Sequence, residues 1–201
     1  MNLTKLLFTA LLAATFVTFA AMASSAQTDD RNRPEPNFQI ALHLIVGGAD
    51  GAAKGELPTS LAAVARQIRS AVPYPSYRLA STYIGRVGNT GNFEYKSVAD
   101  LLGKSQSDPA TFLEWSVGNI RLVGSDYQAQ SFRFGARVPV RSMIPSTDGS
   151  KLNQIVNYEP IGLSFQRVGV SENVPTLLGT LTLPQSGETL FLVMTVSRTD
   201  R

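Results

Sequence analysis

The sequence predicts an α+β fold: one β–helix–β unit followed by a mainly antiparallel, sandwich-like β-region. After residue 26, a single stretch has the three- and four-residue apolar spacing of a helix. The other apolar runs alternate with polar residues and end at glycine or proline, as β-strands do. With 43% hydrophobic and 16% charged residues, the chain is too apolar to be disordered.

Residues 1–26 have the pattern of a signal peptide. Lys5 precedes an uncharged apolar run at 6–22, and small residues suited to cleavage end at Ala23 and Ala26. The run approaches the ~18 residues of a membrane span, so an uncleaved anchor is the competing interpretation. Because the run is rich in alanine and threonine, we favour cleavage. The chain is then expected to be exported, periplasmic or secreted, without a membrane span after cleavage.

The rest of the chain is interpreted as one domain with a polar leader. Residues 27–37 are polar and contain two prolines, which indicates a flexible lead-in. We expect an α+β domain at 38–201. Within it, 38–100 would form the helix-containing part and 111–201 the β-rich part.

The domain begins with a predicted strand at 38–46, which two glycines end. A glycine-rich loop follows, and the period then changes to that of a helix. Pro58 marks the start of this helix, and Pro73 prevents its continuation. We predict a single long helix, whose apolar face consists of Leu61, Val64, Ala65, Ile68 and Val72.

All later elements are predicted strands. They cover 77–87, 92–98, 111–123, 127–140, 155–158, 163–168, 176–183 and 189–196. The first two flank a glycine-bounded turn that favours a hairpin, and the last two form a second predicted hairpin. Gly118 and Asn119 indicate a bulge, and Pro160 and Gly162 separate two strands. The run 190–194 is apolar on both faces, which predicts a central strand covered on both sides.

Three arginines form the clearest candidate binding surface. Arg133, Arg137 and Arg141 repeat every four residues and therefore share one side of a strand. Arginine recognises carboxylates and phosphates through two parallel hydrogen bonds, so this arginine stripe could bind an acidic partner. The alternative is a solvated outer face that discourages edge pairing.

Residues suited to catalysis or metal binding are sparse. The chain has no cysteine and one histidine, His43, in the middle of the first predicted strand. No acid or nucleophile is spaced to work with it, so we interpret it as a strand histidine. We therefore expect no metal site and no cofactor. The formal charge of +3 over 201 residues gives no reason to expect a nucleic-acid partner.

Two glycine patterns could suggest a nucleotide site. Residues 103–105 read Gly-Lys-Ser, but position 98, where a phosphate-binding loop requires glycine, is valine. The glycines at 47, 48 and 51 lie between a strand and a helix without the dinucleotide spacing. We reject the first pattern and interpret the second as a loop.

Two further functions remain open. A glycan- or ligand-binding domain could use Trp115, Tyr127 and Tyr158 as stacking surfaces. A hydrolase would need two positioned carboxylates, and no spacing selects a pair. The candidates are Glu94, Glu114, Asp126 and Glu159.

Short motifs in about a third of the chain resemble the secretins, bacterial outer-membrane channel proteins. Their pattern is a Gly-x-x-Val-Pro stretch, a loop, and a strand containing tyrosine and an isoleucine-glycine-leucine run. The matching positions are Gly135, Val138, Pro139, Tyr158, Ile161, Gly162 and Leu163. The segments 174–179 and 190–195 look like the strands that close the secretin core, and the β–helix–β unit is similar in outline to secretin periplasmic N-domains.

The resemblance implies a secretin-like module in a Gram-negative-type envelope. The additional hairpins that build a secretin channel and gate have no counterpart in the sequence, so we do not expect a complete channel subunit. We therefore predict a non-catalytic envelope module that acts by protein binding or assembly.

Overall fold

The computed structural model describes residues 37–49, 57–99, 101, 109–145, 152–184 and 186–199. They belong to one compact unit, Pro36–Arg201. The predicted signal peptide at 1–26 and the lead-in up to residue 36 lie outside the described residues, as does the Gly-Lys-Ser pattern at 103–105.

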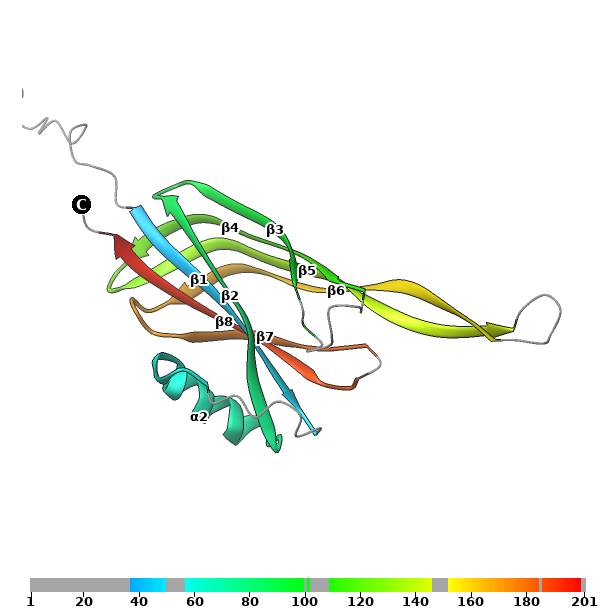
Figure 1. Cartoon of the computed structure of the whole chain (residues 1–201). Helices are drawn as coiled ribbons and strands as arrows, with labels where there is room; N and C mark the ends of the chain where they lie inside the picture. The colour runs from blue at the N-terminus through cyan, green and yellow to red at the C-terminus, as the bar shows by residue number, and fades with distance from the viewer. Residues whose placement is uncertain are drawn as a thin grey trace, which may run out of the picture. The chain divides into compact units, whose positions relative to one another are not determined.

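Two four-stranded antiparallel sheets make up this unit (Figure 1). Sheet A has the order β2-β1-β8-β7, and its strands are β1 (Asn37–Gly48), β2 (Ser76–Gly88), β7 (Thr176–Thr182) and β8 (Thr189–Thr199). Sheet B has the order β3-β4-β5-β6, and its strands are β3 (Asn92–Ala99), β4 (Thr111–Val123), β5 (Asp126–Pro145) and β6 (Leu152–Val170). The β-rich architecture agrees with the sequence prediction. Because β1 and β2 share sheet A with β7 and β8, the two predicted parts of the domain share one sheet.

The main hydrophobic core lies between the two sheets. Alternate residues of every central strand point into it, including Leu42 of β1, Trp115 of β4 and Phe134 of β5. A second, smaller core lies on the other face of sheet A, where helix α2 (Ala62–Ala71) packs. The order of layers is therefore helix, sheet A, sheet B. The outer face of sheet B is left without a covering layer among the described residues.

The helix has the predicted apolar face but not the predicted length. Leu61, Val64, Ala65 and Ile68 are buried, and Pro58 precedes a short 3-10 turn, η2 (Thr59–Leu61), that leads into α2. The α-helix has 10 residues, so the expected single long helix is wrong. It ends at Ala71 because two prolines follow closely. The strands on either side, β1 and β2, are antiparallel neighbours.

The first predicted hairpin is also wrong. Residues 88–91 do make a tight turn, in which the Gly91 N–H donates to the Gly88 carbonyl over 3.0 Å. However, β2 is an edge strand of sheet A and β3 an edge strand of sheet B, so the turn carries the chain from one sheet to the other. The second predicted hairpin is confirmed, because β7 and β8 pair antiparallel.

Two predicted interruptions do not break the strands. β4 pairs with β5 in one register on both sides of Asn119, which takes up the irregularity through a positive φ of 49° instead of a bulge. The predicted strands at 155–158 and 163–168 are parts of one strand, β6, which passes through Pro160 and Gly162. Both residues are tolerated because β6 is an edge strand.

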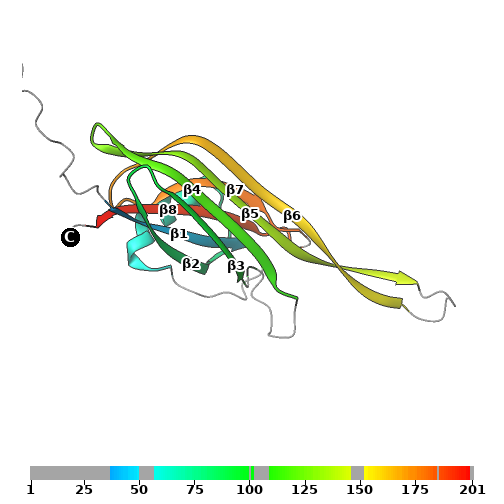
Figure 2. The ribbon, with the colours of Figure 1, turned by 90° about the horizontal axis from the view of Figure 1, so that it is seen from above.

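β5 and β6 extend beyond the rest of sheet B as a two-stranded arm (Figures 1 and 2). The arm comprises 138–145 of β5 and 152–159 of β6, which pair with each other throughout. β4 pairs with β5 only from Arg137 toward Asp126, so it does not reach the arm. No helix among the described residues is long and apolar enough to cross a membrane.

Candidate functional site

The strand registers bring residues from all four strands of sheet B into rows on its outer face. One row consists of Val98, Phe112, Arg137 and Pro160; the next of Lys96, Glu114, Gly135 and Gly162; and a third of Glu94, Ser116, Arg133 and Ser164. The side chains of these residues point away from the main core. A surface made of neighbouring, chemically different residues is thus displayed on a rigid sheet.

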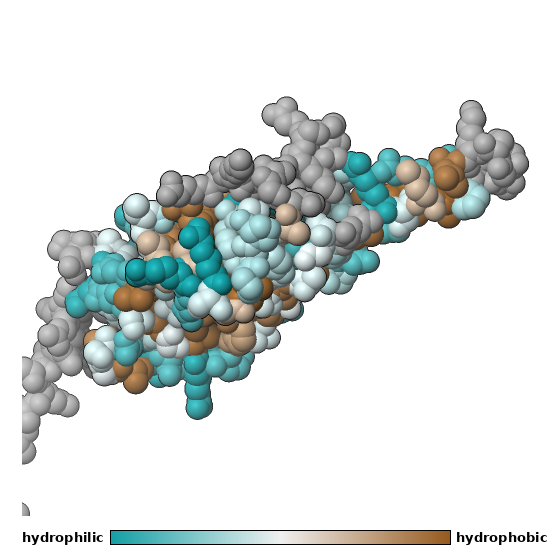
Figure 3. All heavy atoms as spheres, turned by 90° about the horizontal axis from the view of Figure 1, so that it is seen from below, coloured by the Kyte–Doolittle hydropathy of each residue, from teal (hydrophilic) through white to brown (hydrophobic). Residues whose placement is uncertain are grey.

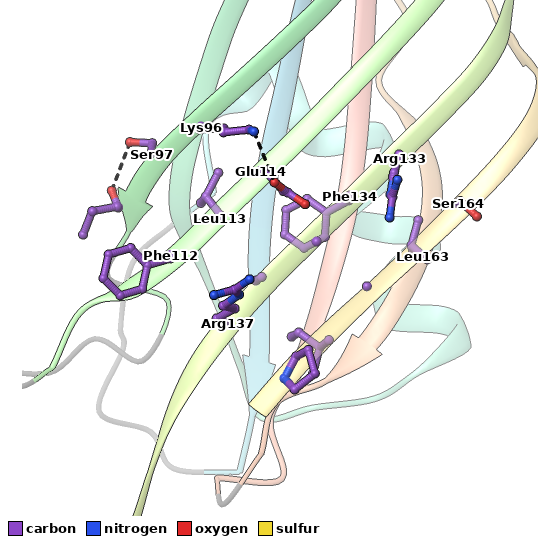
Figure 4. Close-up of a pocket in the computed structure, with 16 residues that line it drawn as sticks. Lys96, Ser97, Phe112, Leu113, Glu114, Arg133, Phe134, Arg137, Leu163 and Ser164 are labelled. Carbon is purple, nitrogen blue, oxygen red and sulfur yellow. Dashed lines mark hydrogen bonds and ion pairs between the residues drawn. The ribbon is translucent and has the colours of Figure 1, made fainter. Parts of the chain in front are cut away.

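A hollow of about 930 Å³ lies over these rows (Figure 4). Arg133 and Arg137 of β5 and Glu114 of β4 line it, together with the aromatic ring of Phe112 and the ring of Pro160. The hollow therefore combines two cations on β5 with apolar rings, and Phe112 and Pro160 lie on either side of Arg137 in the row nearest the arm.

Two glycines explain why the sheet is hollowed at this point. Gly135 and Gly162 are cross-strand neighbours in the middle row and leave no side chain above the backbone. A Cβ atom added to Gly162 would lie 2.6 Å from the Phe134 carbonyl oxygen, so this position requires glycine for β6 to approach β5. A Cβ added to Gly135 would be 3.6 Å from Glu114, an ordinary contact, so the fold does not require glycine at this position.

The charges around the hollow differ in how they are neutralised. Lys96 Nζ is 3.0 Å from Glu94 Oε1 and 3.8 Å from Glu114 Oε2. The hydrogen bond that Lys96 donates to Glu94, together with the charges of Glu94 and Glu114, raises the pKa of Lys96 above its ordinary value. Arg133 and Arg137 are exposed, and neither forms an ion pair or hydrogen bond with a described residue. Within the described part of the chain, no side chain competes with a ligand for these two guanidinium groups.

The arginine stripe continues from the hollow onto the arm. Arg133, Arg137 and Arg141 all lie on the outer face of β5, as their spacing predicts, and successive members are separated by about 13 Å at the usual rise of a strand. Next to the stripe, the rings of Phe112 and Tyr158 pack 5.5 Å apart and connect the hollow to the arm. The outer face thus combines a line of cations with a neighbouring apolar strip.

His43 lies far from this surface, on the outer face of sheet A. Its Nδ1 is 3.0 Å from Thr82 Oγ1 on the neighbouring strand β2. Partial burial lowers the pKa of His43 below its ordinary value. No described group of three or more histidine, aspartate or glutamate residues is arranged to hold a metal ion.

The candidate hydrolase carboxylates are dispersed or engaged. Glu94 and Glu114 both contact Lys96, and Asp126 accepts a hydrogen bond of 2.7 Å from the Ser171 hydroxyl. Glu159 is exposed on the arm. Of these four carboxylates, only Glu114 lines the described hollow.

Two of the three aromatic residues expected to stack on a glycan are in the wrong place for that role. Trp115 and Tyr127 are buried in the main core, where Trp115 packs 4.8 Å from Phe93 and Tyr127 packs 5.2 Å from Phe38. Only Tyr158 is exposed, at 42%. The expectation failed because Trp115 and Tyr127 lie at inward-facing positions of their strands.

The sequence did not identify Phe112 as part of the site, nor the role of Gly135 and Gly162 in shaping it. Gly135 and Gly162 are part of the motif that resembles the secretins. Their position opposite each other depends on the register between β5 and β6, which the sequence does not specify. Phe112 is the second residue of β4, in which burial alternates from residue 111 to 117, and its outward place in this alternation was the only signal available. Comparison of the chain with protein-family models and with curated proteins finds no match.

Proposed function

We propose that this chain is a non-catalytic module of the bacterial cell envelope, periplasmic or secreted, that binds a protein partner on the outer face of sheet B. One observation carries the proposal: Arg133 and Arg137 flank a glycine-floored hollow and have no ionic partner among the described residues. The export signal predicted at 1–26 supports the envelope location.

The geometry favours an extended acidic segment as the ligand. Carboxylates four residues apart on an extended chain are separated by about 13 Å, the same distance as successive arginines of the stripe. The bare backbone at Gly135 and Gly162 lets a main chain approach closely, and the Phe112 and Tyr158 rings offer apolar contact beside it. Arg133 and Arg137 would each hold one carboxylate through two parallel hydrogen bonds.

Replacement of Arg133, Arg137 and Arg141 together by serine tests this proposal. The probe is a synthetic extended peptide with glutamate at positions 1, 5 and 9. We expect the variant to bind it at least about ten-fold more weakly by calorimetry or fluorescence titration, since charged hydrogen bonds are lost. Raising the salt concentration should weaken wild-type binding, and a peptide with glutamine at the same positions should bind poorly.

The matched control replaces Arg66, Arg86 and Arg121 by serine, which changes the net charge equally at exposed sites away from the hollow. Both triple variants should keep the wild-type melting temperature, because exposed charges contribute little to stability. If the control variant weakens peptide binding as much as the stripe variant does, the peptide is bound through the net charge of the protein, and the proposed site is wrong.

A further inference from the structure

The arm has two free edges and many exposed apolar side chains. Among the described strands, neither 138–145 of β5 nor 152–159 of β6 has a second neighbour. Figure 3 shows hydrophobic residues along the arm. The large hydrophobic residues exposed there are Met143, Ile144, Leu152, Ile155, Val156 and Tyr158. An isolated two-stranded ribbon is marginally stable in water, so the arm is suited to gaining a further strand.

Prolines determine which edge can accept that strand. Pro139 pairs with Tyr158 and Pro160 with Arg137, and a proline nitrogen cannot donate to the ladder. In these two pairs, the backbone N–H and C=O groups therefore point away from the β5–β6 ladder. The same holds for every second residue along each strand of the arm. On the β5 edge, Pro139 and Pro145 remove two of these donors.

The β6 edge of the arm, in contrast, is intact and uncharged. By the same alternation, its outward main-chain groups belong to Leu152, Gln154, Val156 and Tyr158, each of which has an N–H. The run 152–158 contains no charged residue. Natural edges are usually protected by charge, proline or covering structure, so this one is open to pairing.

The β6 edge is also complementary to itself. In an antiparallel pairing centred on Ile155, Leu152 lies opposite Tyr158, Gln154 opposite Val156 and Asn153 opposite Asn157 of the other copy. The two Ile155 side chains meet at the centre. Leu152 thus meets Tyr158 and Ile155 meets its counterpart, both apolar pairs, and the asparagine amides can exchange hydrogen bonds. Gln154 faces the apolar Val156, and no like charges face each other.

We propose that two copies of this chain associate through their arms, with 152–158 of β6 pairing antiparallel about a two-fold axis at Ile155. The two ribbons become one four-stranded sheet with roughly eight new main-chain hydrogen bonds, two for each hydrogen-bonded residue pair. Because the paired strands are antiparallel, the main sheets of the two copies lie at opposite ends of the shared four-stranded sheet. This association uses the edge of β6 and is independent of the ligand proposed for the outer face.

Two proline substitutions at one cross-strand pair test the proposal. Gln154→Pro removes an outward donor from the β6 edge, and Met143→Pro removes the donor directly opposite, on the β5 edge. In sedimentation or light-scattering measurements, the wild type and Met143→Pro should have twice the mass of one chain. Gln154→Pro should dissociate about ten-fold or more readily, because each dimer loses two hydrogen bonds. Circular dichroism checks that both variants remain folded.

A cysteine experiment tests the register without altering the backbone. The chain has no cysteine, so Ile155→Cys introduces a unique thiol at the proposed axis. Facing residues of such a pair have Cα atoms about 4.5 Å apart, within the range of a disulfide. Mild oxidation should give a covalent dimer. Ile144→Cys, on the same face but on β5, should give none. A wild type that remains a monomer at every concentration, or equal crosslinking by both cysteine variants, would overturn the proposal.

Discussion

His43 illustrates how the environment of one residue sets a pH dependence. Its ring is partly buried on sheet A beside Thr82, and this burial lowers its pKa in the folded state. The unfolded chain has the ordinary value of about 6.5, so the unfolded state binds the proton more readily. The contribution of this residue to stability is therefore complete above pH 6.5 and is lost as the pH falls through the folded-state pKa.

We expect His43→Gln to flatten the pH dependence of the unfolding free energy between pH 7 and pH 5. Glutamine keeps a hydrogen-bonding group near Thr82 but does not titrate. Urea denaturation at several pH values measures the effect, and the wild type should lose more stability than the variant over this interval. If the unfolding free energy changes equally with pH in the two proteins, His43 has the same pKa in the folded and unfolded states.

At the scale of the element, β8 gives the closest agreement between the sequence prediction and the structure. It lies between β1 and β7, and its residues 190–194 are almost completely buried on both faces. Leu190, Leu192 and Met194 point into the main core, and Phe191 and Val193 into the core beneath α2. An uninterrupted apolar run is sufficient to predict such a strand because both faces require apolar side chains.

Met194→Asp should destabilise the protein by several kcal/mol, since it buries a charge without a partner. Met194 is 0% exposed, and its strand neighbour Leu42 is equally buried. The control is Ile84→Asp on β2, at a position that is 61% exposed. There we expect a change within about 0.5 kcal/mol. Thermal and chemical denaturation measure both variants, and an unaltered Met194→Asp protein would contradict the double coverage of β8.

Pro160 and Gly162 mark the limit of sequence-based prediction for the strands. Proline and glycine both have a low propensity for β-strands, yet these two residues lie inside β6. They are tolerated because of two properties of the fold: β6 is an edge strand, and it approaches β5 so closely at Gly162 that a side chain would collide with the Phe134 carbonyl. Neither the edge position nor the close approach is encoded in the local pattern.

At the scale of the whole molecule, the candidate site was predicted in part. The four-residue spacing placed the arginine stripe on one face of β5, but the hollow depends on registers between β3, β4, β5 and β6 that no single segment determines. The prediction that β2 and β3 form a hairpin within one sheet was wrong for the same reason, because no single segment determines which strands pair. A short turn is compatible with a hairpin and with a passage between stacked sheets, and only packing of the whole core selects between them.

The N-terminal prediction also belongs to this scale and concerns residues outside those described. If residues 1–26 are removed on export, the first residue of the protein recovered from the periplasm or medium should lie between Ser24 and Thr28. Terminal sequencing or intact-mass spectrometry measures this directly. Recovery of chains that retain Met1 in the membrane fraction would identify the segment as an anchor.

The central position of β8 has a consequence for the order of folding. β1 is made early, but its neighbours in sheet A are β2 and β8, and β8 is the last described strand. Until residues 189–199 have been synthesised, one edge of β1 is unpaired and the core beneath α2 lacks Phe191 and Val193. Such pairing between distant parts of a chain is slow. The nascent chain should therefore stay unfolded and accessible to chaperones or a translocation channel until synthesis of β8 is complete.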